Sequence, residues 1–547
     1  MEIHKITISH YKQLRNFQLA FSANDRSLSE LAIKFLIGEN GSGKSSLIEA
    51  IGLIFTRALH DESPGFEYEL TYSVFDNKGK RVYVYLTNQK KKKLTYRLQV
   101  RTHPEFDKVD RAGIRDYRFS EQTELHPNKI LSFASGPNNE LEDVLYHSAL
   151  KSLHSDMYDE MNNGQEATID HLESLGASFV YEPNFLNFDN RSAIFILLAL
   201  VSSVPDRPQF RKAYLAKRQK LLDNVPGFNP LGFSVTVDEM TIDKLLLGRP
   251  GVVLKKWPRY LSLFRQWLGK AWEQSSVAIR HSSDGQPPRV QRTFYFSLSK
   301  EHAAEDGYGL LDNCPPEDLH RAPLEFLNML MVAYRSGYIA DAHLQYTVTG
   351  SDHVLDDGEL SDGEWLWLCR MGLVLLVQQE NIDNVLFLFD EPDVFLNESW
   401  TMQFVEELYR LGKVPKFNGS EYRDGFMNHE YFIATHSTLL LTDAMKSQTY
   451  VFHKLLNEQN GVTIEAEQVN MSTFAADRTE ISARLFTKRN RTGKYARQKI
   501  NQAIKSKSID DLDRLIAEVG PGYDRFRLEH MRISLQSEEE GESSDAN

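Results

Sequence analysis

One short segment near the start of the chain contains the residue types that hold a phosphate group. Residues 38–45 read GENGSGKS, the pattern of a phosphate-binding loop, or Walker A motif. Its three glycines permit backbone angles and a close approach that side chains would block. Backbone N–H groups of the loop and of the helix after it can then surround anionic oxygens, while Lys44 reaches the β- and γ-phosphates and the Ser45 hydroxyl binds Mg²⁺. The predicted phosphate-binding residues are Gly38, Asn40, Gly41, Ser42, Gly43, Lys44, Ser45 and Ser46.

Two adjacent carboxylates follow an apolar segment much later in the chain. Residues 385–389 read VLFLF and predict a buried strand that ends at Asp390 and Glu391. At the carboxyl end of a parallel strand, Asp390 would help to hold Mg²⁺ and Glu391 would accept a proton from an attacking water. His436 follows another short apolar segment, residues 433–435, and we predict that it senses the γ-phosphate.

A third motif precedes an apolar helix. Residues 360–364 read LSDGE, and residues 365–377 carry the long apolar run that predicts the helix. Ser361 and the N–H of Gly363 would lie at the helix N-terminus, where anions bind favourably. The same letters could also form a simple helix cap. The position of the motif, about thirty residues before Asp390, favours the anion site.

Length and composition set limits on the rest of the molecule. A chain of 547 residues is too long for one core and predicts two or three compact units. The two cysteines, Cys314 and Cys369, lie far apart without a CxxC pair, which excludes a disulfide framework and fits a reducing cytoplasm. The N-terminal residues show no apolar signal segment, and the longest apolar run, residues 193–201, is far shorter than the ~20 residues of a membrane span. We expect a cytoplasmic protein in which this run forms a buried helix.

The order of apolar patterns predicts an α/β protein with a divided sheet. A buried strand at 31–37 enters the phosphate-binding loop, an amphipathic helix at 46–55 follows it, and residues 66–100 alternate like a hairpin. The middle of the chain has a mostly helical pattern. We predict an N-terminal lobe at 1–140, a helical insertion at 141–345, a C-terminal lobe at 346–450, a C-terminal helical segment at 451–536 and a disordered acidic tail at 537–547.

Taken together, these motifs resemble the ABC-type ATPase heads of the RecF, Rad50, SMC and OLD families. The likeness rests on the segments before and around residues 38–45 and on ELSDGE, FLFDEPDVFL and IATHS in the second half. The resemblance implies a P-loop ATPase head with two lobes around a mainly parallel sheet, using ATP and Mg²⁺. It also implies a head-to-tail dimer, in which Ser361 and Gly363 of one subunit act on ATP held at Lys44 of the other. The glutamine loop of these families is not identifiable, and Gln165 and Asn138 are only candidates.

The segment after the ATPase motifs narrows the family to which the chain is similar. OLD proteins carry a Toprim nuclease, whereas the only D-x-D here, at 511–513, lies in a helical pattern and is interpreted as surface. A compact head without its own nuclease is similar to PtuA, the ATPase subunit of Septu and Septu-like retron anti-phage systems. This resemblance implies a sensor or scaffold that controls a separate HNH-type nuclease. The alternative is a RecF-like DNA-repair ATPase that clamps DNA. A P-loop kinase or GTPase is disfavoured by the signature motif and the Asp390–Glu391 pair.

A chain whose net charge is −13 can bind nucleic acid only through local clusters of basic residues. One of two such clusters, at 484–499, also contains Phe486 and Tyr495, which could stack on bases. A solvated helix face is the alternative interpretation for both. The clusters lie within 207–220 (Arg207, Arg211, Lys212, Lys217, Arg218, Lys220) and 484–499 (Arg484, Lys488, Arg489, Arg491, Lys494, Arg497, Lys499).

Overall fold

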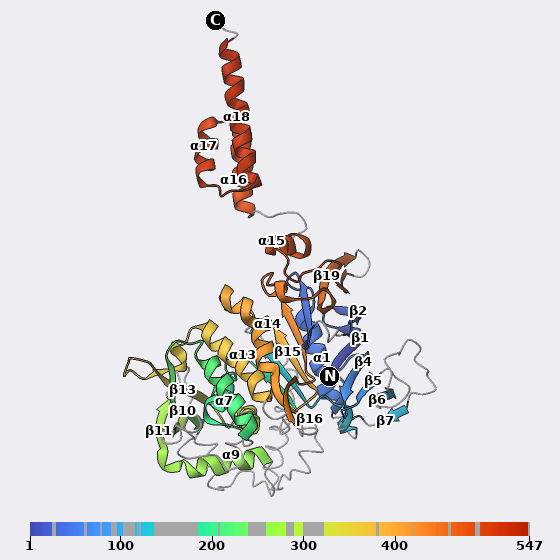
Figure 1. Ribbon diagram of the computed structural model, residues 1–547, viewed down its shortest axis with the longest axis vertical. Coiled ribbons are helices and arrows are strands. Elements are labelled where there is room, and N and C mark those ends of the chain that lie inside the picture. Colours follow the sequence, from blue (N-terminus) through green and yellow to red (C-terminus); the bar gives the residue numbers. More distant parts are fainter. Residues whose placement is uncertain are drawn as a thin grey trace. The chain divides into compact units, whose positions relative to one another are not determined.

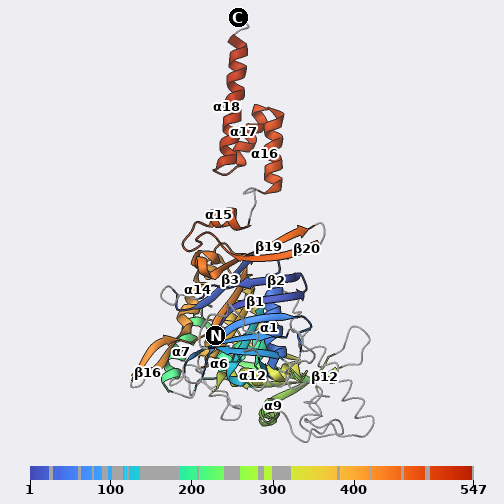
Figure 2. The ribbon, with the colours of Figure 1, turned by 90° about the vertical axis from the view of Figure 1, so that its right-hand side faces the viewer.

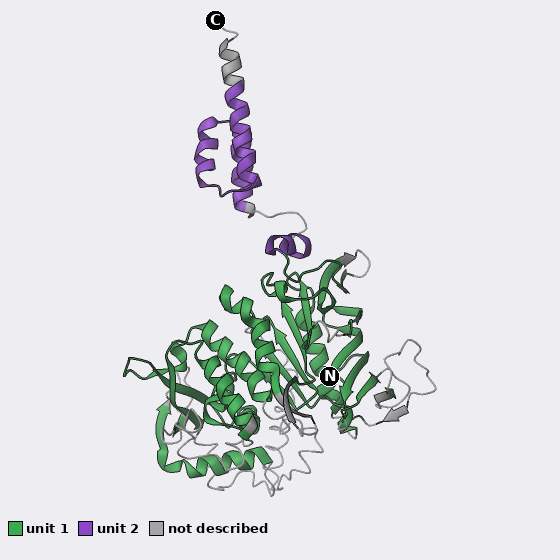
Figure 3. Cartoon of the chain, viewed as in Figure 1, with its two compact units in different colours: residues 1–476 green, residues 477–547 purple. Residues whose placement is uncertain are grey.

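The computed structural model of the chain contains two compact units, Met1–Ala476 and Asp477–Asn547 (Figure 3). Each is described by itself. None of the helices in the described parts of the chain is long and apolar enough to cross a membrane. The structure describes residues 1–23, 29–59, 63–76, 79–88, 96–101, 115–117, 119, 122–135, 184–205, 208–238, 259–280, 289–298, 322–378, 382–418, 421–457, 461–486 and 493–544. Cys314 and both glutamine-loop candidates, Asn138 and Gln165, lie outside these residues.

The first unit is organised around a seven-stranded sheet (Figure 1). All of its strands except the edge strand β20 run parallel to their neighbours. Three central strands are buried almost throughout, as expected for a sheet that is covered on both faces. The predicted α/β fold with a mainly parallel sheet is confirmed. In spatial order the strands are β20 (Gly461–Gln468), β19 (Thr449–Asn457), β3 (Ala32–Gly38), β18 (Glu430–Thr435), β15 (Val385–Asp390), β8 (Lys129–Ala134) and β9 (Phe185–Phe188).

Helices cover both faces of this sheet. Helix α1 (Lys44–Leu59) follows β3, and its buried side packs with Leu386 and Leu388 of β15. Phe389, which points to the opposite face, contacts Phe404 of α14 (Glu398–Gly412) at a ring-centroid distance of 6.3 Å. Helix α13 (Asp362–Gln378) packs against α14 and against α6 (Ile194–Ser202). Every residue of α6 is buried, so the predicted buried helix at 193–201 is confirmed.

A second, antiparallel sheet covers the outer side of α1. Phe55 of α1 meets Tyr72 of this sheet edge to face, with ring centroids 5.2 Å apart. The predicted strand-rich region at 66–100 therefore forms three strands of this sheet rather than an isolated hairpin. In spatial order the strands are β2 (Leu14–Ala20), β1 (Glu2–Tyr11), β4 (Tyr68–Phe75), β5 (Arg81–Thr87), β6 (Tyr96–Arg101) and β7 (Arg115–Tyr117).

The prediction that the insertion at 141–345 is helical is wrong, because its described part also contains an antiparallel sheet. Two of its strands alternate buried and accessible residues, and the central strand β10 pairs with β12 and β13 on its two sides. The sheet extends beyond position 345, to β14. The strands are β11 (Ser275–Arg280), β12 (Arg289–Ser297), β10 (Phe228–Asp238), β13 (Asp341–Val348) and β14 (Leu355–Asp356); the accompanying helices are α6, α7 (Pro208–Leu222), α9 (Arg259–Lys270) and α12 (Pro323–Arg335).

The predicted boundary at 450/451 also differs from the structure. Strand β19 begins at Thr449 and adds to the parallel sheet beside β3, and β20 returns along it as an antiparallel edge. Strand β20 also contacts β2, so the two sheets meet here (Figure 2). Residues 449–468 therefore belong to the seven-stranded sheet and not to a C-terminal helical segment. A small hairpin, β16 (Lys413–Asn418) and β17 (Glu421–Phe426), follows α14.

The second unit is helical in its described part. Helix α16 (Lys494–Ser506), helix α17 (Ile509–Glu518) and helix α18 (Tyr523–Ser544) share a small core that contains Ile500, Leu512 and Leu528. Leu512 of the D-x-D segment lies in this core, while Asp511 and Asp513 are exposed on α17. Helix α18 is assigned as far as Ser544, and the disorder expected for 537–547 stays a prediction. Its glutamates have high intrinsic helix propensity.

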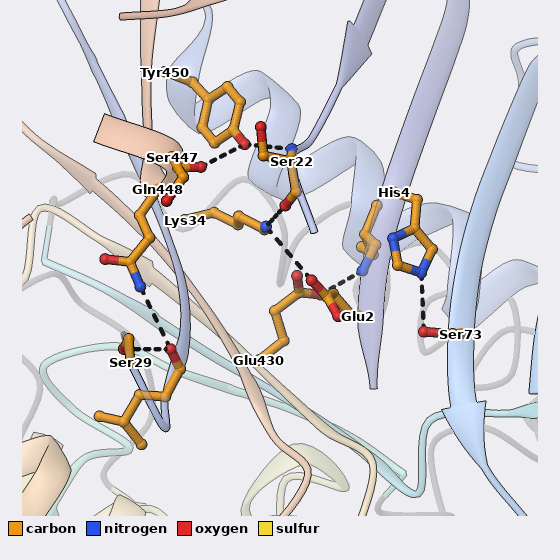
Figure 4. Close-up of polar contacts among 12 residues, drawn as sticks. Glu2, His4, Ser22, Ser29, Lys34, Ser73, Glu430, Ser447, Gln448 and Tyr450 are labelled. Atoms are coloured by element: carbon orange, nitrogen blue, oxygen red, sulfur yellow. Dashed lines mark hydrogen bonds and ion pairs between the residues drawn. The ribbon is translucent and has the colours of Figure 1, made fainter. Parts of the chain in front are cut away.

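A buried polar cluster joins β1 to the parallel sheet (Figure 4). The Lys34 ammonium donates to the backbone carbonyl of Ser22 at 2.6 Å and lies 3.9 Å from a Glu2 carboxylate oxygen. The backbone N–H of Ile3 donates to Glu430 Oε2 at 2.7 Å. Burial raises the pKa of Glu430 to about 8, against the opposing effect of Lys34. The cluster holds the N-terminal strand next to β3, the strand that delivers the phosphate-binding loop.

Candidate active site

The phosphate-binding loop lies between β3 and α1, and its glycines are required by geometry. Gly38 has φ +148°, and a side chain there would place its Cβ 2.5 Å from the carbonyl oxygen of Phe452. Gly41 and Gly43 have φ values of +73° and +93°, in the region that favours glycine. A Cβ on Gly43 would also lie 3.0 Å from the Leu14 side chain. The loop can therefore turn tightly and direct its backbone N–H groups inward.

Lys44 is buried inside this loop. Its ammonium donates to the carbonyl oxygens of Gly38 at 3.1 Å and Glu39 at 3.3 Å. It also lies 2.8 Å from His436 Nε2. Burial lowers the pKa of Lys44 to about 8, although the neighbouring carboxylates act in the opposite direction. The positive charge is thus held where it is poorly hydrated, which strengthens its attraction for a phosphate.

The Ser45 hydroxyl and the Asp390 carboxylate meet at the end of β15. Ser45 Oγ donates to Asp390 Oδ1 at 3.1 Å. Burial raises the pKa of Asp390 to about 6; the hydrogen bond from Ser45 lowers it and the nearby Glu391 raises it. Hydroxyl and carboxylate oxygens are ligands that Mg²⁺ accepts, usually together with phosphate oxygens. The pair therefore fits a magnesium ion, which when bound would neutralise charge on the phosphates.

Glu391 begins a tight turn and has a left-handed backbone, with φ +51°. Such a conformation costs about 1–3 kcal/mol in a residue other than glycine and persists only where the surroundings impose it. Here the Glu391 N–H donates to the carbonyl of Ala434 on β18 at 2.8 Å. The side chain is 41% exposed, and its Oε1 lies 3.5 Å from His436 Nε2. The carboxylate is therefore accessible to a water molecule at the edge of the site.

His436 lies directly after β18, between the lysine and the glutamate. Burial and the adjacent Lys44 charge both lower the pKa of His436. The imidazole is consequently neutral near pH 7, and Nε2 can accept a hydrogen bond from the Lys44 ammonium. Strands β3, β18 and β15 are parallel neighbours, so their carboxyl ends bring Lys44, Asp390, Glu391 and His436 to one edge of the sheet.

A buried network that the sequence analysis missed supports this turn. The Arg370 guanidinium, from the middle of α13, donates to Ser135 Oγ at 2.5 Å and to the carbonyl of Pro392. Ser135 Oγ in turn donates to the Glu391 carbonyl at 2.9 Å. Thr435 Oγ1 donates to Asp393 Oδ1 at 2.6 Å. Arg370 is a single charge within an otherwise apolar helical pattern, and such a residue indicates a buried, paired cation.

The 360–364 motif lies at the start of α13 and forms a helix cap within the chain. Ser361 Oγ donates to Glu364 Oε2 at 2.7 Å, and the Glu364 N–H donates back to Ser361 Oγ at 3.3 Å. A Cβ on Gly363 would lie 2.8 Å from the Phe395 carbonyl oxygen, so a larger residue does not fit. Among the described residues of this chain, no hydrogen bond joins Ser361 to the phosphate-binding loop. The role expected for Ser361 and Gly363 requires a second copy.

The first basic cluster is largely used inside the fold. Arg218 is buried and donates to the Leu200 carbonyl at 3.2 Å, and Lys217 donates to the Leu411 carbonyl at 2.9 Å. Arg211 donates to the Pro205 carbonyl at 3.1 Å. The predicted nucleic-acid contact through 207–220 thereby loses three of its cations. Arg207 lies outside the described residues, and Lys212 and Lys220 are exposed on α7.

Comparison with known proteins supports the nucleotide chemistry. A family model described as an AAA ATPase domain matches residues 1–173, which include the phosphate-binding loop. No curated protein matches the chain. Among solved structures, the chain is similar to one described as "Structure of the recombination mediator protein RecF-ATPrS in RecFOR pathway", with 14% identity, a TM-score of 0.29 and coverage of 84% of this chain and 97% of that one. Residues 1–173, which carry the phosphate-binding loop, are thus similar to an AAA ATPase domain.

Proposed function

We propose that this chain is the ATP-hydrolysing sensor or scaffold subunit of an anti-phage defence complex, and that it controls a separate HNH-type nuclease. The observation that carries the ATPase part is the convergence of four groups at one sheet edge. Lys44, the Ser45–Asp390 pair, Glu391 and His436 lie at the ends of neighbouring strands. This set combines a phosphate-binding cation, a metal-binding pair, a base and a polar sensor.

The chemistry follows from these positions. Backbone N–H groups of the loop and the Lys44 ammonium bind the phosphates of ATP. Ser45 and Asp390 would hold Mg²⁺. Glu391 orients a water molecule and accepts its proton, since its carboxylate reaches the solvent-accessible edge of the site. His436, neutral and adjacent to Lys44, detects whether the γ-phosphate is present.

Pairing of two copies would complete the site. Ser361 is exposed at the N-terminus of the 17-residue helix α13, where a phosphate of a second copy could be bound. ATP would therefore join two heads, and hydrolysis would release them. The link to a nuclease rests on the resemblance of the motif set and chain organisation to PtuA. A RecF-like clamp on DNA is the competing function, and the experiment below separates the two.

The test uses the purified chain and a phage challenge. We expect Mg²⁺-dependent ATP hydrolysis that is lost in Lys44→Ala and retained in the matched control Lys212→Ala, which removes an exposed lysine of α7. Cells that express the chain together with a nuclease encoded beside it should resist phage, and the Lys44→Ala variant should abolish resistance. Hydrolysis without any nuclease-dependent protection, but with ATP-dependent retention on duplex DNA, would favour the clamp.

A further inference from the structure

The second unit contains a groove that the ATPase chemistry does not use. It lies between the first half of α16 and the turn that joins α17 to α18, and has a volume of about 850 Å³. Arg497, Tyr523 and Arg527 contribute to its lining, together with the carboxylates of Glu518 and Asp524. Asp524 lies 3.5 Å from the Arg527 guanidinium, so these two charges offset each other. Arg497 has no carboxylate partner among the described residues, but Glu518 also lines the groove, so its lining carries two positive and two negative side chains.

Two tyrosines of the second unit are unusually exposed, one in the lining of this groove and one near the start of α16. Tyr495 on α16 is 74% exposed and Tyr523 on α18 is 76% exposed. Each ring carries a cation over its face: Lys499 Nζ is 5.6 Å from the Tyr495 centroid, and Arg527 Cζ is 5.9 Å from the Tyr523 centroid. Aromatic rings beside cations are the recurring elements of single-strand binding surfaces, because bases stack on the rings while phosphates contact the cations.

The charge distribution around α16 supports an anionic polymer as the occupant. Residues 493–507, which include α16, contain five lysines and arginines and neither Asp nor Glu, in a chain whose net charge is −13. The apolar side of α16, with Ile500 and Ala503, packs into the core of the unit. Its polar side is therefore directed to solvent, and Arg497 and Lys505 line a second, adjoining groove of about 430 Å³ with the side-chain amides of Gln498, Asn501 and Gln502.

We propose that single-stranded nucleic acid binds along α16 and the start of α18, with Tyr495, Arg497, Lys499, Tyr523 and Arg527 as its contacts. A single strand is favoured over a duplex because the tyrosines can stack only on bases that are not already paired. This inference is independent of the ATPase site, and the binding surface lies wholly within the second unit.

The experiment measures binding of the full-length chain to fluorescent 20-nucleotide dT and rU strands over a range of salt concentrations. The log–log salt dependence should have a slope of about 0.7 per phosphate contact for a single strand. Arg497→Gln should lower this slope by about that amount. Tyr495→Ala and Tyr523→Ala should each weaken binding roughly 5- to 150-fold, whereas the Tyr→Phe variants retain the ring and should bind nearly as the parent does. The dT and rU arms distinguish DNA from RNA.

Matched controls separate a specific effect from a folding defect. Tyr295→Ala removes a tyrosine that is 44% exposed on β12 in the first unit and should leave binding unchanged. All variants should retain ATP hydrolysis. Equal binding of a duplex and a single strand, or unchanged affinity in the Tyr495→Ala/Tyr523→Ala double variant, would overturn the proposal. In that case the unit is better explained as a protein-docking element.

Discussion

Glu391 is the residue whose role is most open to a direct test. It adopts a left-handed backbone, its side chain is accessible, and it lies beside His436. Replacement by glutamine keeps the shape and removes the base. We predict that Glu391→Gln lowers the rate of ATP hydrolysis about 10²- to 10⁴-fold and leaves ATP affinity within a few-fold of the parent. Single-turnover hydrolysis and a nucleotide titration measure the two quantities.

The matched control for this variant is Glu465→Gln, an exposed glutamate on β20 that should hydrolyse ATP normally. Near-normal hydrolysis by Glu391→Gln would mean that another carboxylate is the base. Asp393 would then be the next candidate, although its carboxylate already accepts a hydrogen bond from Thr435.

The pH dependence of nucleotide binding follows from Asp390 and Lys44. Below about pH 6, Asp390 takes up a proton and loses the charge that would hold Mg²⁺. Above about pH 8, Lys44 loses the proton that gives it its positive charge. We therefore predict that Mg²⁺–ATP affinity is highest between about pH 6 and pH 8 and decreases on both sides. In Asp390→Asn we expect a lower Mg²⁺–ATP affinity that no longer decreases below about pH 6. If the decrease below about pH 6 is unchanged in this variant, another group causes it.

At the scale of elements, α13 connects two parts of the site. It begins at the Ser361 cap, and nine residues later Arg370 reaches the turn that carries Glu391. Because Arg370 bonds Ser135 and the Pro392 carbonyl, a movement of α13 would be transmitted to the position of the Glu391 backbone. Arg370 is thus a positioning residue. Burial lowers the pKa of its guanidinium to about 10, which still leaves it charged at neutral pH.

We predict that Arg370→Met lowers the hydrolysis rate more than it lowers ATP affinity. The variant leaves the Pro392 carbonyl and Ser135 without their donor, at a cost of about 1–3 kcal/mol in the free energy of unfolding. Arg370→Lys should restore part of the hydrolysis rate. Arg335→Met is the control, because Arg335 is also buried and donates to a carbonyl, that of Phe185, away from the site. Equal losses of stability with equal hydrolysis rates in both variants would show that Arg370 is only structural.

At the scale of the whole molecule, the question is whether one copy completes the site of another. Since Ser361 caps α13, alanine there would destabilise the helix by about 1 kcal/mol and confuse the result. Ser361→Asp can still accept the Glu364 N–H, although it loses the hydrogen bond that Ser361 donates to Glu364 Oε2, and it places a negative charge where a phosphate would bind. We predict that Ser361→Asp alone does not hydrolyse ATP, and that mixing it with inactive Lys44→Ala restores partial hydrolysis through hybrid dimers.

Normal hydrolysis by Ser361→Asp alone would mean that residues 360–364 are a helix cap and nothing more. Hybrid formation should be verified with differently tagged copies, since a mixture that forms hybrids but recovers no hydrolysis contradicts the composite site in the same way.

Local patterns in the sequence predicted the elements that carry the chemistry. The strand before the phosphate-binding loop, the helix after it and the strand that ends at Asp390 all depend on short-range apolar periodicity and on turn residues. The same reasoning missed the antiparallel sheet of β10 to β14, because its strands lie among helical segments and the central strand pairs with strands that are distant in sequence. It also placed a domain boundary at 450/451, inside the parallel sheet, because β19 is recognisable only by its pairing with β3.

What the sequence alone determined about this protein is the identity of its reactive groups. A loop of fixed length, GENGSGKS, and an apolar strand followed by two carboxylates each define their geometry within a few residues. Only the tertiary structure decided what supports them. Arg370 and Ser135 are 235 positions apart and meet behind the Glu391 turn, and three cations of 207–220 donate to backbone carbonyls of their own fold. The physical reason is that burial and pairing of a charge depend on residues distant in sequence, which no local pattern records.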